Sequence, residues 1–318
     1  MRDYIIRRLL LLPLIMIGVS FLTFALFRFI PGNACVLDQG FGATQETVTA
    51  CSKAHGLDRA WYVQYVDWLD GIPTGDFGTS LTESDQPVKE ELKHRLPVTL
   101  ELMMLTLVFA IILGIPPGIL SAVRSSSPAD YTSRFMSVLM LSIPNFYLGI
   151  LIITFASAWL GWTPPQFEQS YVSFFDDPLT NLEEFIPPAF VLGVGIAAVL
   201  MRLTRSSMLE VMRNDYIRTA WSKGLRERTV VWRHAMKNAL IPVVTVLGLQ
   251  IGALIGGAVL IESVFALNGI GKYVLEAIVR RDFLVVQSLV LLFAVVYVIA
   301  NLLVDIAYAW LDPRIHYG

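Results

Sequence analysis

Charged residues are scarce in this sequence of 318 residues. Only 16% of the chain is Asp, Glu, Lys or Arg, and 55% is hydrophobic, with a mean hydropathy of +0.61. Soluble globular proteins carry about a quarter charged residues, so this chain has too little polar surface to cover a soluble core. The formal net charge of −2 gives no electrostatic reason for binding nucleic acid. The excess of apolar residues therefore predicts an integral membrane protein.

Residues that usually carry chemistry are also sparse. The only cysteines are Cys35 and Cys51, the four histidines are scattered, and neither HExxH, CxxC nor GxSxG occurs. A zinc or iron site and a hydrolase nucleophile are therefore not indicated. The nearest approach to a P-loop, NGIGKY at residues 268–273, lacks one Gly and the Ser or Thr of GxxxxGK[ST]. We expect no enzyme activity, metal or cofactor on this chain.

Six apolar stretches are long enough to cross a bilayer, which takes roughly 20 residues. They are Leu9–Ile30, Val98–Val123, Phe135–Leu160, Ile186–Leu203, Leu240–Ile261 and Phe283–Ala309. The first follows three arginines, as a signal peptide would. Its apolar run exceeds the ~7–15 residues of a signal sequence, and no A-x-A site follows, which favours a retained span over a cleaved signal. The prediction is an all-α protein with six transmembrane helices.

Helix-disturbing residues lie inside several of these spans. Pro116-Pro117 and Pro144 predict kinks. The fifth span carries a stripe of small residues that would let helices approach closely: Gly248, Gly252, Gly256 and Gly257. A kinked bundle suits a transporter, although packing alone explains the glycines equally well.

Basic residues are sorted along the chain. If the N-terminus is cytoplasmic, the inside segments hold fifteen of the 24 Lys and Arg: 1–8, 124–134, 202–239 and 310–318. The outside segments hold eight: 31–97, 161–185 and 262–282. Cytoplasmic connections carry the excess of basic residues in membrane proteins. We therefore expect both termini in the cytoplasm.

The connection 31–97 is long, and we expect it outside. Cys35 and Cys51 both fall in it, where oxidising conditions permit a disulfide, but two independent thiols fit the spacing equally well. Within it, residues 57–69 place aromatic and apolar side chains at helical spacings, which is typical of an amphipathic helix at the membrane surface. The alternative is a docking surface for an external binding protein, with these candidates: Trp61, Tyr65, Trp68, Asp76 and Phe77.

Charges inside the spans are few. Glu101 lies near the start of the second span and Asp305 near the end of the sixth, both close to an interface, where a charge costs least. A proton- or ion-coupled carrier often needs an acid at the bilayer midplane, and none is evident. This pattern disfavours an ATP-independent carrier or channel and suggests that a partner supplies the energy.

The segment 202–239 is the most basic part of the chain, with nine basic residues and three acids. Its sequence predicts a short helix from Asp215 to Lys223 that Gly224 ends, and then a second helix running toward Leu240. From the residues alone, a positive loop that merely sets the topology is the simpler interpretation.

This stretch nevertheless resembles the "EAA loop" of importer-type ABC permeases, in which a Gly follows a short helix between two late spans. The usual Glu-Ala-Ala is here Arg218-Thr219-Ala220, and His234, Asn238 and Pro242 stand where the peptide-permease branch has them. Further matches follow in the family's order: FRFIPG at 27–32, GDFGTS at 75–80, RLPVTLEL at 95–102, SIPNFYLG at 142–149 and LDPR at 311–314. Over nearly its whole length the chain is similar to the B-type permease subunit of dipeptide/oligopeptide ABC importers.

The resemblance implies a type I (MetI-like) ABC importer permease fold. It divides the chain into a first span at 1–30, an extracytoplasmic domain at 31–97, a permease core at 98–312 with a coupling loop at 202–239, and a cytoplasmic tail at 313–318. It also implies that the coupling loop docks on an ATPase through the following residues: Asp215, Tyr216, Arg218, Thr219, Ala220, Lys223, Gly224, Leu225, Arg233, His234 and Asn238.

The resemblance also implies the other subunits of the importer. They comprise a second homologous permease subunit, two ATPase subunits that use ATP and Mg, and an extracytoplasmic substrate-binding protein, assembled in the lipid of a bacterial or archaeal inner membrane. The implied substrates are di- and oligopeptides. Relatives that carry nickel, glutathione or oligosaccharides share the same architecture, so those substrates stay as alternatives.

Overall fold

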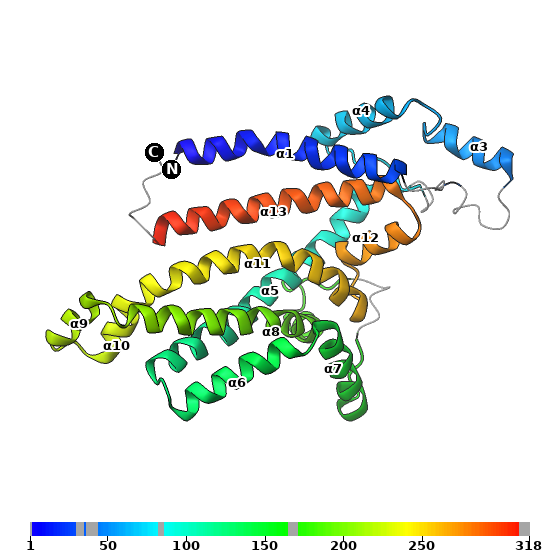
Figure 1. The fold of residues 1–318 in the computed structure, drawn as a ribbon. Helices are drawn as coiled ribbons and strands as arrows, with labels where there is room; N and C mark the ends of the chain where they lie inside the picture. The colour runs from blue at the N-terminus through cyan, green and yellow to red at the C-terminus, as the bar shows by residue number, and fades with distance from the viewer. Residues whose placement is uncertain (1, 30–34, 36–43, 82–85, 165–170, 312–318) are drawn as a thin grey trace. The chain divides into compact units, whose positions relative to one another are not determined.

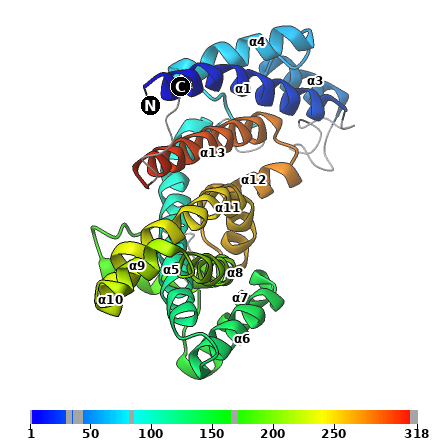
Figure 2. The same ribbon diagram turned by 60° about the vertical axis from the view of Figure 1, so that its left-hand side comes forward.

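The computed structural model describes residues 2–29, 35, 44–81, 86–164 and 171–311. This part of the chain is helical apart from its loops and one isolated bridge between Thr79 and Pro87 (Figures 1 and 2). The chain forms two compact units. One unit contains residues 5–99 and 268–298, and the other contains residues 100–267 with both chain ends, 1–4 and 299–318.

Five helices of the described chain are long and apolar enough to cross a membrane. They are α1 (Arg2–Phe29), α5 (Val88–Val123), α8 (Pro178–Val211), the continuous helix Glu227–Val264, and α13 (Phe283–Leu311). A sixth crossing exists if α6 (Pro128–Ser142) and α7 (Asn145–Leu160) count as one span. The all-helical fold is therefore confirmed, with five or six spans.

The span expected at Phe135–Leu160 is divided into two helices, at the Pro144 position where a kink was predicted. α6 and α7 are bent by 95° at the break between them. Ile143 is extended there, with φ −99° and ψ 120°, because the ring of Pro144 disfavours helical geometry in the residue before it. Pro116-Pro117, in contrast, lie within α5 without ending it.

In the unit 100–267, α8 is the central helix and packs against α6, α7 and α11 (Met236–Val264) (Figures 1 and 2). Two glycines also let α5 approach α8 closely. A Cβ on Gly114 would lie 2.8 Å from Ala197 O, and one on Gly118 would lie 2.7 Å from Met201 O. Backbone thus meets backbone along this contact, a packing mode typical of membrane helices.

The predicted glycine stripe of the fifth span has a mixed outcome. A Cβ on Gly257 would lie 2.8 Å from Leu192 Cδ1 on α8, so a larger residue there would require the end of this leucine side chain to shift. A Cβ on Gly256 would meet nothing within 4 Å. Of these two neighbouring glycines, only Gly257 lies in close contact with α8.

A partly buried ion pair joins α6 to α8. Arg205 Nε donates to Asp130 Oδ1 at 2.7 Å, and its Nη2 donates to Oδ2 at 2.9 Å. The same carboxylate accepts hydrogen bonds from Ser121 Oγ on α5 at 2.6 Å and from Ser126 N at 3.0 Å. Asp130 is 1% exposed, so these donors replace water around its charge.

The unit 5–99 and 268–298 is held by polar contacts between segments far apart in sequence. Arg95 donates to Glu91 at 2.7 Å and to Asn268 Oδ1 at 2.6 Å, and its guanidinium lies 4.4 Å from the ring centre of Tyr273 on α12 (Ile270–Val279). Asp282, ahead of α13, accepts from Ser80 Oγ at 2.6 Å. These contacts hold Ser80 and the first turns of α5 against residues 268–282.

A disulfide lies in the same unit. Cys35 and Cys51 are joined with an S–S distance of 2.00 Å, and Cys51 belongs to α3 (Gln45–Ala54). Of the two alternatives open from the sequence, the structure has the bonded one.

Candidate functional site

The basic segment after α8 forms a short helix that is separate from the spans. α9 (Asp215–Ser222) follows α8 after a turn, and α10 (Glu227–Thr229) and the π-helical segment η3 (Val230–Ala235) lead into α11. The expected short helix, Asp215 to Lys223, is therefore present and one residue shorter. In Figure 1, α9 and α10 lie together at one end of α8.

One face of α9 is buried. Ile217 is fully buried and Ala220 is 6% exposed, and both belong to an apolar cluster formed with side chains of α5, α8, η3 and α11. Other members of this cluster are Ile119, Met208, Val230, Ala235 and Ala239. Burying an Ile side chain stabilises by about 1.5–3 kcal/mol, so Ile217 anchors α9 firmly to the spans. α9 is therefore packed directly against α5, α8, η3 and α11.

A glycine ends α9, as predicted. Gly224 has φ +74°, and its N–H donates to Trp221 O at 2.9 Å. Side-chain-bearing residues reach this left-handed region only at a cost of about 1–2 kcal/mol. A Cβ here would meet nothing within 4 Å, so the requirement for glycine is one of backbone conformation alone.

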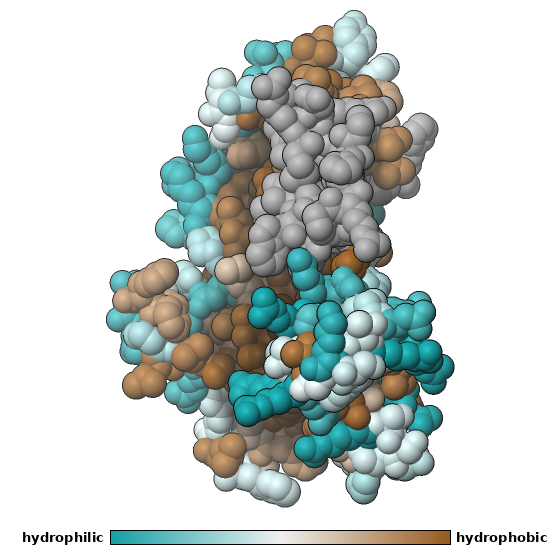
Figure 3. Space-filling view, turned by 90° about the vertical axis from the view of Figure 1, so that its left-hand side faces the viewer, coloured by the Kyte–Doolittle hydropathy of each residue, from teal (hydrophilic) through white to brown (hydrophobic). Residues whose placement is uncertain are grey.

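The other face of α9 is exposed and mostly basic and aromatic. The side chains of Arg218 and Asp215 are 74% and 94% exposed, and Tyr216, Thr219 and Lys223 are exposed as well. Figure 3 looks onto the end of α8 that carries α9 and α10, where hydrophilic side chains gather. Arg218 Nη1 lies 3.4 Å from Asp215 Oδ1, while Tyr216 and Lys223 are exposed beside this pair.

The following helix supports α9 directly. Asn238 Nδ2 on α11 donates to the Tyr216 hydroxyl at 2.8 Å. Arg233 is exposed and His234 is half-buried, and both lie on η3, while Leu225 packs against the apolar cluster. π-helical turns often mark functional positions, because they shift the register of a helix locally. The predicted coupling residues therefore gather around α9, η3 and the start of α11.

Sequence reasoning missed three residues of this region. Ile217 anchors α9, and Trp221 and Trp232 are large aromatic side chains exposed beside it. The spacing of Ile217 and Ala220, three residues apart on one helical face, could have identified the buried side. For Trp221 and Trp232, nothing in the sequence shows whether the side chain faces water or lipid.

The predicted external docking residues divide into two groups. Trp61 is 54% exposed, and Asp76 is exposed, with Oδ1 accepting from Gly78 N at 2.9 Å. Trp68 is buried, and Tyr65 packs on α1, where its hydroxyl lies 2.9 Å from Ser20 Oγ. Phe77 is half-buried and its carbonyl accepts from Ser288 Oγ. Only Trp61 and Asp76 of these five candidates are free to meet a partner in this conformation.

Another polar contact lies in the loop before α8. The Tyr171 hydroxyl donates to Glu101 Oε2 at 2.6 Å. Burial of the phenol, together with this carboxylate, raises the pKa of Tyr171 to about 12. The phenol therefore stays protonated at neutral pH and ties the loop to α5.

A multi-helix membrane bundle with a short surface helix docked between two late spans is the architecture of a transporter permease. The chain belongs to the family described as binding-protein-dependent transport system inner membrane component, whose model matches residues 114–317. A companion model, for the N-terminal part of such membrane components, matches residues 1–103. The chain is thus the membrane-spanning permease subunit of an ABC transporter and not its ATPase.

Relatives of similar length support this membership. The dipeptide transport system permease protein DppB of Alkalihalophilus pseudofirmus is 40% identical, with 100% of both chains covered. The oligopeptide transport system permease protein AppB of Bacillus subtilis is also 40% identical over 100% of both chains. DppB of Escherichia coli is 39% identical over 100% of this chain and 99% of its own.

Solved structures share the fold. An inward-facing structure of the MetNI methionine ABC transporter has a TM-score of 0.54 at 18% identity, covering 69% of this chain and 94% of that one. An amino acid ABC transporter crystallised with histidines has a TM-score of 0.54 at 12% identity, covering 76% and 98%. The expected ABC importer permease fold is thereby confirmed.

Proposed function

We propose that this chain carries di- and oligopeptides into the cell as one permease half of an ATP-driven importer, with α9 as the helix that couples it to an ATPase subunit. The observation that carries the coupling role is the two-sided geometry of α9. Ile217 and Ala220 fasten it to the spans, while Arg218 and Lys223 face outward. A helix built in this way transmits a push or pull from a partner to the bundle.

The assembly would contain a second homologous permease chain, two ATPase subunits that bind ATP and Mg, and an extracytoplasmic binding protein that delivers the substrate. ATP shifts the equilibrium between inward- and outward-open states only if it binds one of them better. Closure of the ATPases around ATP would supply that difference, and α9 would pass it to α8 and α11. Residues 31–97 form the outer domain in this arrangement, and Trp61 and Asp76 are its available contacts.

The orientation follows from charge. The segments predicted to be cytoplasmic, 202–239 with α9 among them, hold fifteen of the 24 Lys and Arg, which supports a cytoplasmic location for α9 and for both chain termini, in the inner membrane of a bacterium or archaeon. An ATPase subunit would then lie on the side where ATP is available.

The names of the most similar relatives support peptides as the substrate. Uptake of a radiolabelled dipeptide by cells or proteoliposomes containing the assembled importer would test this part. Competition by unlabelled di- and oligopeptides is the expected result. Competition by nickel, glutathione or an oligosaccharide instead would contradict the peptide substrate while leaving the coupling role intact.

Gly224 allows a sharp test of the coupling role. Gly224→Val should distort the end of α9 and lower both peptide uptake and permease-stimulated ATPase activity about tenfold, since forcing a side chain into the left-handed region costs about 1–2 kcal/mol. Gly224→Asn should retain more activity, because Asn tolerates this conformation. Membrane insertion should be unchanged in both variants.

Gly161 provides a matched control. It has φ +67°, it ends α7, and a Cβ at this position would meet nothing within 4 Å, so Gly161→Val imposes the same backbone strain outside the coupling region. We expect this variant to keep its ATPase coupling. Equal losses of uptake and ATPase activity in the two valine variants would mean that backbone strain at any helix end lowers transport. That outcome would count against α9 as the coupling helix.

A further inference from the structure

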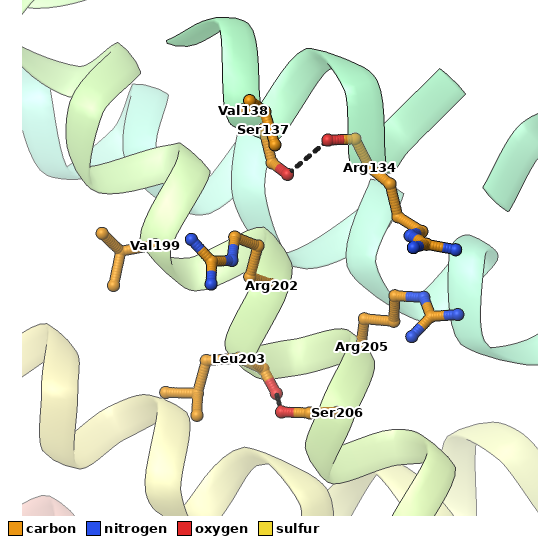
Figure 4. Close-up of a pocket in the computed structure, with 8 residues that line it drawn as sticks. All are labelled: Arg134, Ser137, Val138, Val199, Arg202, Leu203, Arg205 and Ser206. Carbon is orange, nitrogen blue, oxygen red and sulfur yellow. Dashed lines mark hydrogen bonds between the residues drawn. The ribbon is translucent and has the colours of Figure 1, made fainter. Parts of the chain in front are cut away.

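A second basic site lies between α6 and α8, apart from α9. It is an open pocket of about 720 Å³ lined by the following residues: Arg134, Ser137, Val138, Val199, Arg202, Leu203, Arg205 and Ser206 (Figure 4). All eight belong to the unit 100–267. Arg134 comes from α6 and the other two arginines from α8, so the two helices contribute cations to one cavity.

The charges in this pocket are not balanced by the protein. Arg205 is neutralised by its two-bond contact with Asp130. Within the described part of the chain, neither Arg134 nor Arg202 has an acidic partner. Two guanidinium groups therefore face the pocket with a net positive charge. Such groups bind phosphate or carboxylate oxygens well, because their N–H donors form a planar fork.

The surroundings of the pocket are apolar. Val138, Val199 and Leu203 form part of its wall. On α6, large exposed side chains at positions three to four residues apart continue from Val138 along one face of the helix: Tyr131, Phe135 and Leu139. Arg134 lies on this same face. A ligand that suits both features has an anionic head and a hydrocarbon tail.

We propose that this pocket holds the phosphate head group of an acidic phospholipid, with its acyl chain along the apolar face of α6. Lipid is the solvent of a membrane-spanning chain, and basic pockets between transmembrane helices bind acidic head groups. The bound lipid would stabilise the contact between α6 and α8 next to the Asp130–Arg205 pair. This inference does not depend on which substrate the transporter carries or on the role of α9.

The test uses the assembled transporter in nanodiscs of phosphatidylcholine mixed with phosphatidylglycerol, and native mass spectrometry of the lipids that stay bound. We expect phosphatidylglycerol to be enriched on the wild-type protein. Arg134→Gln combined with Arg202→Gln should lower this enrichment more than tenfold, because each basic side chain near an acidic surface contributes about fivefold. Arg134→Lys should lower the enrichment less, since lysine keeps the positive charge but lacks the planar pair of N–H donors of the guanidinium.

Arg213→Gln is the matched control, because Arg213 belongs to the same unit and lies outside the pocket. It should leave the enrichment unchanged. Equal enrichment in the double variant and the wild type would overturn the proposal. Full displacement of the lipid by inorganic phosphate would assign the pocket to a free anion instead. A Phe135→Cys crosslink that captures the second permease chain would show that protein, not lipid, covers this face.

Discussion

At the scale of single residues, Asp130 shows how a charge is accommodated inside a helical bundle. Its carboxylate accepts from both ends of the Arg205 guanidinium, from Ser121 and from a backbone N–H, so its hydrogen-bonding capacity is filled. These donors come from α5, from α8 and from the turn before α6. The ion pair therefore specifies how α5, α6 and α8 fit together as well as compensating its own burial.

Replacing Asp130 should accordingly destabilise the bundle. Asp130→Asn keeps the shape but leaves the partly exposed Arg205 guanidinium without its counter-charge, a loss that should cost about 1–3 kcal/mol. We expect a lower thermal midpoint of the purified protein in detergent. Combining Asp130→Asn with Arg205→Gln should recover part of the loss, because the unpaired cation is then removed. Additive losses in the double variant would show that the two side chains act independently.

Ile217 makes the corresponding prediction for the candidate coupling helix. Ile217→Ala removes the fully buried side chain that holds α9 to the apolar cluster, at a cost of about 2–4 kcal/mol. Backbone amides of residues 215–224 should then exchange hydrogen faster, and ATPase coupling should fall. Arg218→Ala is the control on the exposed face, where it should weaken coupling without faster exchange. Unchanged exchange in Ile217→Ala would contradict the anchoring role.

Some of these residues could be predicted from the sequence and others could not, depending on whether their role is set locally or by contacts between helices. Gly224 could be predicted because only glycine reaches its backbone conformation easily, and this is a local property. Asp130 and Arg205 could not be predicted, since they are 75 residues apart and their pairing depends on how two helices pack. A single sequence therefore reveals local backbone preferences, but it does not reveal which distant residues pair.

At the scale of helices, close packing of α5 on α8 depends on glycine. Gly118→Ala would bring a methyl group within 2.7 Å of Met201 O and 2.8 Å of Thr204 Cβ, both on α8, so the helices would have to separate. Overpacking of this kind costs about 1–3 kcal/mol and should lower the thermal midpoint. Gly256→Ala is the control, because the added methyl group meets nothing within 4 Å. A similar loss in both variants would argue that glycine flexibility, not packing, is what matters.

The helices could largely be predicted from the sequence. The effects of the prolines could not, because they depend on the helices that pack around each proline. Apolar length identified five spans that are single helices, because a bilayer-crossing helix needs about 20 apolar residues, and a sixth that is divided between α6 and α7. The proline signals were ambiguous: Pro144 breaks the chain between α6 and α7, whereas Pro116-Pro117 lie inside a continuous α5. Helices in a bundle tolerate proline where neighbours compensate for the lost hydrogen bond, so its effect is decided by the surroundings.

At the scale of the whole molecule, the segregation of basic residues links the fold to its proposed function. A coupling helix can act only on the cytoplasmic side of the membrane, where an ATPase can bind. The proposed role of α9 therefore requires that the distribution of Lys and Arg also places α9 in the cytoplasm. The disulfide between Cys35 and Cys51 agrees with the same arrangement, because disulfides persist outside the cytoplasm. The basic segment around α9 and the disulfide therefore require one orientation, which can be measured.

Single introduced cysteines would measure it, using a membrane-impermeant maleimide on intact cells. The native cysteines should not react until a reductant is added, because their thiols are joined. Asp176→Cys, exposed in the loop before α8, should be labelled in intact cells. Ser222→Cys, exposed at the end of α9, should be labelled only after the membrane is permeabilised. Labelling of Ser222→Cys in intact cells would place α9 outside, where no ATPase subunit could grip it, and the proposed coupling role would fail.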